Sequence, residues 1–498
     1  MIAGWSRRPE VWTFVILLAS YAWFWHGRDW NSASRLMLTY AIVDRGTIVI
    51  DGLDDQTHDI AVYRGRHYTD KMPGFSVLGL VPYSAARWTL GLPPHPLGVK
   101  GFAYWPADYW VTLGVSGLAT AAIGALLARL ALRMGCGPRT SVLVGLGYGL
   151  ATPAYVYATM SYGHQPAAFA LLASFLILRG VIGGATTLWL ATAGFLAAYA
   201  SVIELQVGPV SAILGLDLVV QVIARRRPVG AMFAFGAGAL MPTFLLLGYN
   251  AAAFSSPFDM GYFHLITEQF AKVHNKENPL GLTRPDWSVA TKLLWGPTRG
   301  IFRTAPILLL ATPGVIVLVR RRAWAWLLTP MLVCLSVFWV NLSYPEWTGG
   351  WSTGPRLLVP LLPFGMIPVA ALLAWGKRRW TWAAAGLALL GAVIVFLYQG
   401  VGGRIPNPIE NPFLDGVWPL WSGRPIPPWS FHGRFEKTVI DLVAPGWIAG
   451  VAERDRWIAF VPLVAFQVLA IGLMAWFVRV PGGQAAEVRE SETSASIG

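Results

Sequence analysis

A short polar stretch after the first apolar run carries residue types that can do acid–base and phosphate chemistry. Residues 59–71 predict a β-hairpin that turns at Arg64-Gly65. In the register of a two-residue turn, Asp59 faces Asp70, and opposed side chains share one face of a hairpin. Two carboxylates at that spacing repel, which raises the pKa of one of them or recruits a cation. Either outcome suits a general base or a divalent-metal site.

Four acidic residues are candidates for a catalytic base. The hairpin geometry favours Asp59, and Asp29, Asp51 and Asp70 are the alternatives. For any one of them, an ordinary solvated surface acid is the competing interpretation. Lys71 follows Asp70 directly and is a candidate ligand for a phosphate group.

Later parts of the chain add cations, aromatic rings and one acid at membrane depth. Arg299 and Arg356 are candidate phosphate ligands, because a guanidinium matches the geometry of phosphate oxygens. The Glu204 carboxyl falls near the end of an apolar run, where an acid is costly and is usually functional or paired. Tryptophan suits a sugar face, and anchoring at a membrane interface is its alternative use. The candidate substrate-binding residues are His67, Tyr68, His164, Glu204, Trp347 and Trp351.

The elements that must position these residues are membrane helices. Of the 498 residues, 55% are hydrophobic and 13% are charged, whereas a soluble domain carries about 25% charge. Apolar runs of about 17–24 residues recur, and each is long enough to span a bilayer. The net charge is +13, but the positive residues lie mostly in short loops beside the apolar runs. That distribution indicates membrane topology and not nucleic-acid binding.

The pattern predicts an all-α polytopic membrane protein with about twelve spanning helices. Their expected ranges are 11–26, 107–131, 141–159, 165–181, 186–203, 207–224, 229–250, 301–319, 324–342, 357–375, 381–399 and 457–478. Three basic clusters, 225–227, 320–322 and 377–379, each separate one span from the next. Basic residues stay on the cytoplasmic side. This count therefore places the candidate site residues at the external face of a plasma or inner membrane.

One transmembrane domain, 1–480, and a disordered cytoplasmic tail, 481–498, describe the expected organisation. The long external segments are 27–106, 251–300, 343–356 and 400–456. In the first of them, a helix capped by Ser32 or Ser34 is expected to lie on the membrane interface and to stop at Gly46. Residues 74–90 are expected to form an amphipathic helix on the same interface, because Pro82 interrupts the apolar run.

Two stretches resemble the GT-C superfamily of glycosyltransferases that use lipid-linked sugars. Residues 31–35 and 67–74 are similar to its first external loop, and residues 68–73 carry the pattern Tyr-X-X-Lys-X-Pro. The loop 347–356, with Gly-Gly-Trp and then Gly-Pro-Arg, is similar to a loop of a bacterial subgroup. The resemblance spans about residues 1–375 and is to family-39 and protein-mannosyltransferase-like bacterial members.

The resemblance implies an enzyme that transfers a sugar from a polyprenyl-phosphate donor to a glycan, lipid or protein acceptor at the outer membrane face. It implies an external-loop aspartate as the base on the acceptor hydroxyl and basic residues on the leaving phosphate. The acid of the superfamily falls on Asn31 here, with Asp29 two positions earlier, whereas Lys71 matches the superfamily lysine. The lipid-linked sugar is the expected donor, and the sequence leaves open whether a divalent metal is also required. A lipid-linked saccharide transporter or flippase and a sugar-polymer ligase are the competing functions.

Overall fold

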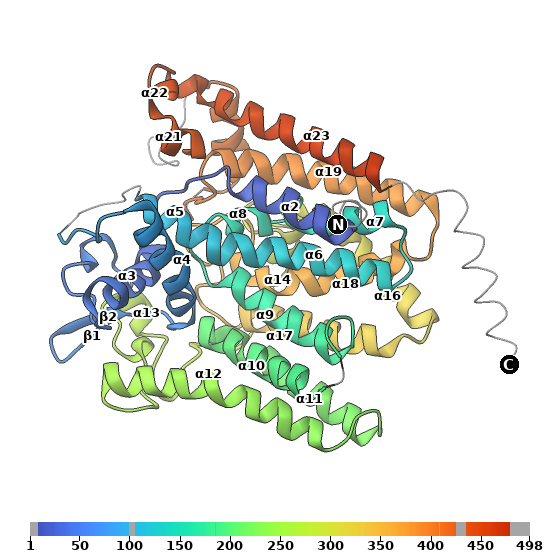
Figure 1. Ribbon diagram of the computed structural model, residues 1–498, viewed down its shortest axis with the longest axis horizontal. Helices are drawn as coiled ribbons and strands as arrows, with labels where there is room; N and C mark the ends of the chain where they lie inside the picture. Colours follow the sequence, from blue (N-terminus) through green and yellow to red (C-terminus); the bar gives the residue numbers. More distant parts are fainter. Residues whose placement is uncertain (1–7, 99–104, 185, 408, 425–434, 479–498) are drawn as a thin grey trace, which may run out of the picture.

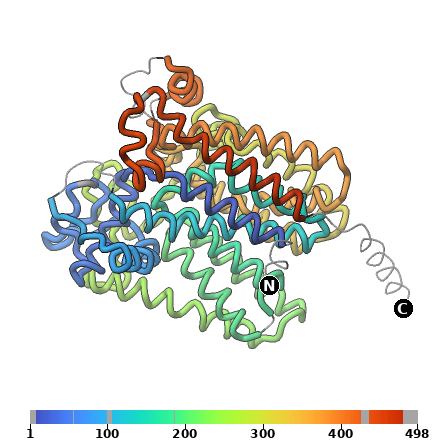
Figure 2. The backbone as a smooth tube through the Cα atoms, turned by 45° about the horizontal axis from the view of Figure 1, so that its top comes forward, coloured from blue at the N-terminus to red at the C-terminus, as the bar shows by residue number. Residues whose placement is uncertain are grey.

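Long helices packed side by side make up most of the protein and run between its two ends (Figures 1 and 2). The computed structural model describes residues 8–98, 105–184, 186–407, 409–424 and 435–478. The long helices are α2 (Pro9–Tyr21), α5 to α6 (Pro106–Arg133), α7 (Pro138–Leu150), α9 (His164–Leu178), α10 (Thr187–Ile203), α11 (Gly208–Ile223), α12 (Gly230–Phe254), α16 (Ala311–Arg320), α17 (Trp324–Leu342), α18 (Leu362–Leu373), α19 (Arg378–Gly400) and α23 (Val461–Phe477). Each predicted span coincides with one of them, so the all-α polytopic fold is confirmed. Within the described ranges, seven helical segments are long and apolar enough to cross a bilayer, and four shorter apolar helices accompany them.

Two predicted spans are not single helices. The span 301–319 consists of α15 (Ile301–Thr304), a break at Ala305, and a 3₁₀ segment (Pro306–Leu310) that continues into α16. The span 141–159 is also divided. α7 ends at Leu150, a short turn follows, and α8 (Ala154–Ala158) then continues the chain. Pro153 lies in that turn. Proline has no N–H for a helix, and its ring disfavours helical geometry at the residue before it.

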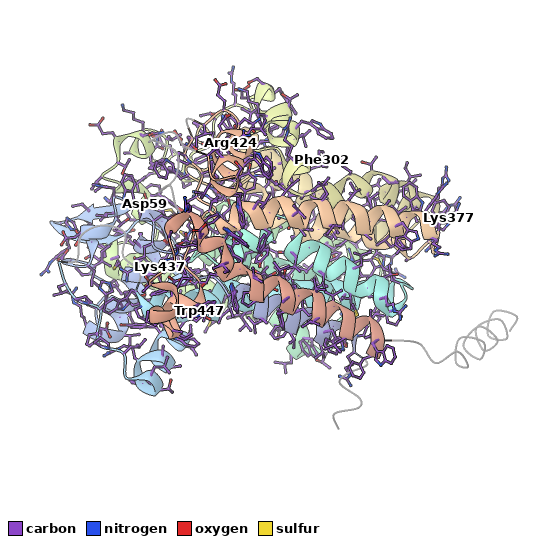
Figure 3. All side chains as sticks on the ribbon, turned by 90° about the horizontal axis from the view of Figure 1, so that it is seen from above. Asp59, Phe302, Lys377, Arg424, Lys437 and Trp447 are labelled. Carbon is purple, nitrogen blue, oxygen red and sulfur yellow. The ribbon has the colours of Figure 1, made fainter. Side chains whose placement is uncertain are left out.

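The two ends of the helix bundle carry different kinds of connection. Lys377 and Asp59 lie at opposite ends of the molecule (Figure 3). The short turns after α11, α16 and α18, which contain the three basic clusters, share the end with Lys377 (Figure 1). The long connections gather at the other end, which we call the loop end. The loop end is therefore opposite to all three basic clusters, and the predicted tail, 481–498, lies outside the described residues.

The first helix of the loop end, α3 (Trp30–Arg45), differs from the expected interfacial helix. Its cap is Asp29: Asp29 Oδ1 accepts from the Ser32 amide at 2.8 Å, and the Asp29 amide donates to Ser32 Oγ at 2.9 Å. Ser32 is thus the third helical residue of a capping box, and neither serine is the cap. From Ser32 to Ala41 the helix is buried on every face, so α3 is a core helix and not an amphipathic one. It ends at Gly46 as expected, with φ +64°.

The predicted hairpin consists of β1 (Ile60–Tyr63) and β2 (Arg66–Thr69). Ile60 pairs with Thr69 in antiparallel register. This pairing confirms the predicted register, so that the residues just outside the strands, Asp59 and Asp70, stand opposite each other.

The remaining loop-end elements are α4 (Gly74–Leu90), α13 (Glu268–Ala271), α14 (Trp287–Trp295), α20 (Trp418–Trp421), α21 (Val439–Val443) and α22 (Pro445–Ile448). α4 packs against α3 on one side and leaves Val81 and Trp88 exposed on the other. This one-sided burial is the pattern expected of an amphipathic helix.

Candidate functional site

A cavity of about 450 Å³ lies at the loop end. Its walls come from the start of α3, the residues flanking the hairpin, the junction of α10 with α11, the segment 262–280 and the loop 344–357. The predicted site residues that line it are Asp29, Asp59, Asp70, Lys71, His164, Glu204, Trp351 and Arg356. The fold thus brings together candidates from distant parts of the sequence.

Lys71 sits between the two opposed aspartates. Its Nζ lies 2.8 Å from Asp59 Oδ2 and 2.7 Å from Asp70 Oδ2. Burial, with the charge of Asp59, raises the pKa of Asp70 despite Lys71. Burial alone would lower the pKa of Lys71, but the two carboxylates outweigh it and raise that pKa. The cation that this carboxylate pair recruits is therefore Lys71, and the ammonium keeps one N–H for a ligand.

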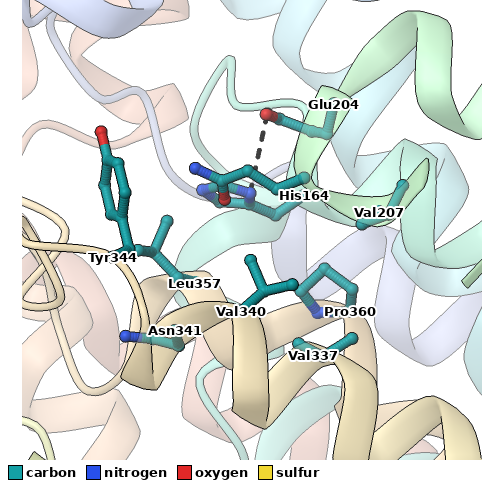
Figure 4. A pocket seen from close by; sticks show the side chains of 10 residues that line it. His164, Glu204, Val207, Val337, Val340, Asn341, Tyr344, Leu357 and Pro360 are labelled. Atoms are coloured by element: carbon teal, nitrogen blue, oxygen red, sulfur yellow. Dashed lines mark ion pairs between the residues drawn. The ribbon is translucent and has the colours of Figure 1, made fainter. Parts of the chain in front are cut away.

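Glu204 follows the last residue of α10 and lies against a guanidinium and an imidazole from other elements. Arg35 Nη2 donates to Glu204 Oε1 at 2.6 Å, and His164 Nδ1 lies 3.6 Å from the same oxygen (Figure 4). Burial would raise the pKa of Glu204, but nearby positive charge, that of Arg35 above all, outweighs it and holds the pKa below its usual value. Burial lowers the pKa of His164 to about 3, so the imidazole is neutral. Gly163 permits this approach, because a Cβ at that position would lie 2.3 Å from Oε1. The acid predicted at membrane depth is thus a paired one.

Asp29 presents its carboxylate to the cavity from the start of α3. Oδ1 accepts from the Ser32 amide, and Oδ2 accepts from the hydroxyl of Tyr162. Burial would raise the pKa of Asp29, but the charge of Arg404 and the hydrogen bonds from Ser32 and Tyr162 outweigh it and lower the pKa. Asp29 is therefore ionised at neutral pH.

Arg356 enters the cavity from the first residue of a 3₁₀ turn, η6 (Arg356–Leu361). Its guanidinium carbon lies 5.1 Å from the centroid of the Tyr162 ring, within the range of a cation–π contact. Its Nε is buried and has no hydrogen-bond partner. Most donors of this guanidinium are thus available to an anion in the cavity.

Ion pairing separates the charged groups of the cavity into two kinds. Three lining cations have carboxylate partners: Arg35, Lys71 and Arg404. Among the residues that the structure describes, Arg356 forms no ion pair, and neither does Asp29. A cation and a carboxylate that both lack an ion-pair partner therefore contact Tyr162.

Three hairpin-side candidates lie outside the cavity. Asp51 accepts from the His67 amide at 2.7 Å, and His67 Nδ1 lies 2.7 Å from Asp54 Oδ2, so these side chains form a separate polar group. Tyr68 points to the face of the hairpin opposite to His67, because successive side chains of a strand alternate. Its ring is buried 5.4 Å from the ring of Phe254.

Arg299 and Trp347 also lie outside the cavity lining. The Arg299 guanidinium is 1% exposed and donates to five oxygens: the carbonyls of Thr298, Thr348, Gly350 and Ser352 and Asn407 Oδ1, at 2.8–3.1 Å. Burial lowers the pKa of Arg299 to about 10. The Trp347 ring packs beneath the Lys292 ammonium, 5.6 Å from its centroid. The N–H groups of Arg299 thus hydrogen-bond to the loop that leads to Arg356 and to its neighbours, and hold that loop in place.

Comparison with solved structures gives the architecture a context. A crystal structure of ArnT from Cupriavidus metallidurans, bound to undecaprenyl phosphate, matches with a TM-score of 0.50 and 15% identity, over 96% of this chain and 76% of ArnT. The apo state of the same protein matches with a TM-score of 0.46 and 17% identity, over 93% and 73% of the two chains. ArnT is a GT-C glycosyltransferase. This chain has the GT-C fold. No family model and no curated protein sequence matches it.

The sequence interpretation did not identify three residues of this cavity. Arg35 lies at the end of the stretch 31–35 that resembles the superfamily, so that resemblance contains a signal for it. Tyr162 stands two residues before His164 without a pattern of its own. Arg404 comes from the third external segment, in which the sequence offers no motif.

A metal was an open question for this site. The described part of the chain contains no group of three or more His, Cys, Asp or Glu side chains placed to hold a metal ion. The opposed pair Asp59 and Asp70, which the sequence offered as a metal site or a base, binds the Lys71 ammonium.

Proposed function

We propose that this protein is a membrane glycosyltransferase that moves a sugar from a polyprenyl-phosphate carrier to an acceptor of the cell envelope, at the external membrane face. The GT-C fold and the charged cavity at the loop end support the proposal, and the ArnT structure with undecaprenyl phosphate supplies the class of carrier. The external orientation rests on the three basic clusters at the opposite end of the bundle.

The observation that carries the proposal is the guanidinium of Arg356, which has no ion-pair partner among the described residues, in a cavity whose other cationic side chains are paired. A single phosphodiester brings one negative charge and oxygens that a guanidinium binds in pairs. Arg356 is therefore the principal phosphate ligand, and the remaining N–H of Lys71 is the second one. The exposed indole of Trp351, 52% exposed at the cavity, is placed to cover a sugar face.

The geometry favours Asp29 as the base over the hairpin acids. Asp59 and Asp70 each bind the Lys71 ammonium through a carboxylate oxygen, whereas Asp29 forms no ion pair among the described residues. In the reaction, the acceptor oxygen bonds to the anomeric carbon while the bond from that carbon to the phosphate oxygen breaks. The acceptor proton passes to Asp29, and the lipid phosphate leaves with its charge against Arg356.

Two measurements on the purified full-length protein test the proposal. The first is binding of undecaprenyl phosphate, with undecaprenol as the uncharged comparison. Arg356→Ala removes charge-assisted hydrogen bonds of about 1.5–3 kcal/mol, so binding should weaken by about 10- to 150-fold. Arg454→Ala removes an exposed charge from the same end and should leave binding unchanged. Equal affinity of the wild-type protein for the phosphate and the alcohol contradicts the proposal.

The second measurement is sugar transfer in membranes from a strain that lacks the protein, which supply donor and acceptor. Mass spectrometry of the envelope glycans identifies the product and its rate of formation. Asp29→Asn should slow transfer by about 10²- to 10⁴-fold, and Asp59→Asn should slow it less. Full transfer by Asp29→Asn with loss in Asp59→Asn returns the base to the hairpin. An unmoved lipid-linked intermediate in the mutant strain favours a flippase instead.

A further inference from the structure

Tyr162 contacts both charged groups of the cavity that lack an ion-pair partner, Asp29 and Arg356. Its side chain is 1% exposed, its hydroxyl donates to Asp29 Oδ2, and its ring carries the Arg356 guanidinium 5.1 Å from the centroid. The residue thus contacts the carboxylate with its polar end and the cation with its aromatic face.

The surroundings fix the position of this ring. The Tyr157 ring stacks on it at 5.8 Å with an angle of 25°, and the imidazole of His164 meets it edge-on at 5.9 Å. The segment that carries Tyr162 is short, because α8 ends at Ala158 and α9 begins at His164. A side chain held on both sides in this way cannot swing away from Asp29.

We propose that Tyr162 is a positioning residue that keeps Asp29 and Arg356 apart and aligned, so that the base and the phosphate ligand do not neutralise each other. The inference rests on the proposed function and adds a residue to it. Without the intervening ring, the carboxylate and the guanidinium that now contact it would be free to form a direct bidentate pair. That pair would occupy the donors needed by the phosphate and the oxygen needed by the acceptor proton.

The protonation states fit this role. Burial, together with the charge of Asp29, raises the pKa of Tyr162, so that its hydroxyl remains a donor. Arg404 and Arg356, from two other segments, also face this region, and the charge of Arg404 lowers the pKa of Asp29 and keeps it ionised. The neutral hydroxyl of Tyr162 therefore donates to the charged carboxylate of Asp29, and the proton stays on the tyrosine.

Two substitutions separate the two contacts of Tyr162. Tyr162→Phe keeps the ring and removes the hydroxyl, whereas Tyr162→Leu removes both. Tyr148→Phe is the matched control, because Tyr148 is equally buried and its hydroxyl bonds to Gln165 Oε1, away from Asp29. The readouts are the affinity for undecaprenyl phosphate and the transfer rate in membranes of the deletion strain.

The expected outcome is a split between binding and transfer. Tyr162→Phe should bind undecaprenyl phosphate within about twofold of wild type, yet transfer sugar about tenfold more slowly or worse. Tyr162→Leu should in addition bind about 3- to 30-fold more weakly, and Tyr148→Phe should change neither readout. A purely structural role predicts parallel losses that follow thermal stability in both variants.

The inference and the proposed function fail in different ways. Wild-type transfer by Tyr162→Phe, or equal binding by Tyr162→Phe and Tyr162→Leu, overturns the role of Tyr162 while Asp29→Asn and Arg356→Ala remain defective. Full activity in those last two variants overturns the proposed function itself.

Discussion

Replacing Arg299 by lysine tests whether this buried arginine is a loop scaffold. Three of the five acceptors around the guanidinium are carbonyls of the loop 348–352, the other two are the Thr298 carbonyl and Asn407 Oδ1, and all are within 3.1 Å. A lysine ammonium has three donors from one point, so at least two acceptors lose their partner. Arg299→Lys is therefore expected to destabilise the protein while keeping the positive charge.

The size of the effect follows from the same hydrogen bonds. A buried acceptor left without a donor costs about 1–3 kcal/mol, which gives about 2–6 kcal/mol for two. The Ser352 hydroxyl also donates to the carbonyls of Thr348 and Gly350. This second donor offsets part of the loss, so we expect about 2–4 kcal/mol.

Unfolding by sodium dodecyl sulfate in mixed micelles, followed by tryptophan fluorescence, measures this loss. The control is Arg303→Lys, because Arg303 is exposed and donates from Nε to the single carbonyl of Trp295. Normal stability of Arg299→Lys together with weakened binding of undecaprenyl phosphate would refute the scaffold argument. That result would return Arg299 to the phosphate site that the sequence predicted.

Three further predictions concern other parts of the loop end. Gly163→Ala should lower the free energy of unfolding by about 1–3 kcal/mol, measured by the same assay. The new Cβ would lie 2.3 Å from Glu204 Oε1 and would displace that carboxylate. The raised folded-state pKa of Asp70 means that its contribution to stability falls as the pH rises from about 4 towards neutrality. The loss of stability in Asp70→Asn should accordingly be smaller at about pH 7 than at about pH 4. In right-side-out vesicles, an impermeant maleimide should label Asp55→Cys and not Arg321→Cys, since the proposed orientation places the loop end outside.

Controls and contradicting results differ for each. Gly236→Ala, on α12 with no atom within 4 Å of the new Cβ, should not destabilise, and an equal loss there removes the steric explanation for Gly163. A stability loss in Asp70→Asn that is larger at about pH 7 than at about pH 4 contradicts a raised pKa for Asp70 in the folded protein. The labelling requires Cys136 and Cys334 to be replaced by alanine first, and labelling of Arg321→Cys alone reverses the orientation.

The fold was accessible from the sequence because its determinants are local along the chain. Apolar runs of bilayer length, each bounded by a charged or polar turn, locate the helices, and the basic clusters assign their ends. The hairpin register follows from the turn at Arg64-Gly65 in the same way. The failures are also local. At α3 a cap was assigned to serines although Asp29 stands three residues before Ser32, and at Pro153 an apolar run hid a break between two helices.

The roles of the charged residues were less accessible, because a charge is defined by its partner and partners come from distant segments. Lys71 matches a superfamily lysine in sequence, yet in space the residues on either side of the hairpin neutralise it. Arg299 looks as outward-facing as Arg356, but five loop oxygens surround one and none of the carboxylates described here pairs with the other. In a cavity of low dielectric, an ion without an ion-pair partner costs free energy unless a ligand of opposite charge binds to it. The cost of leaving Arg356 unpaired is thus the physical reason to expect an anion there, and it is an argument that no spacing of residues along the chain contains.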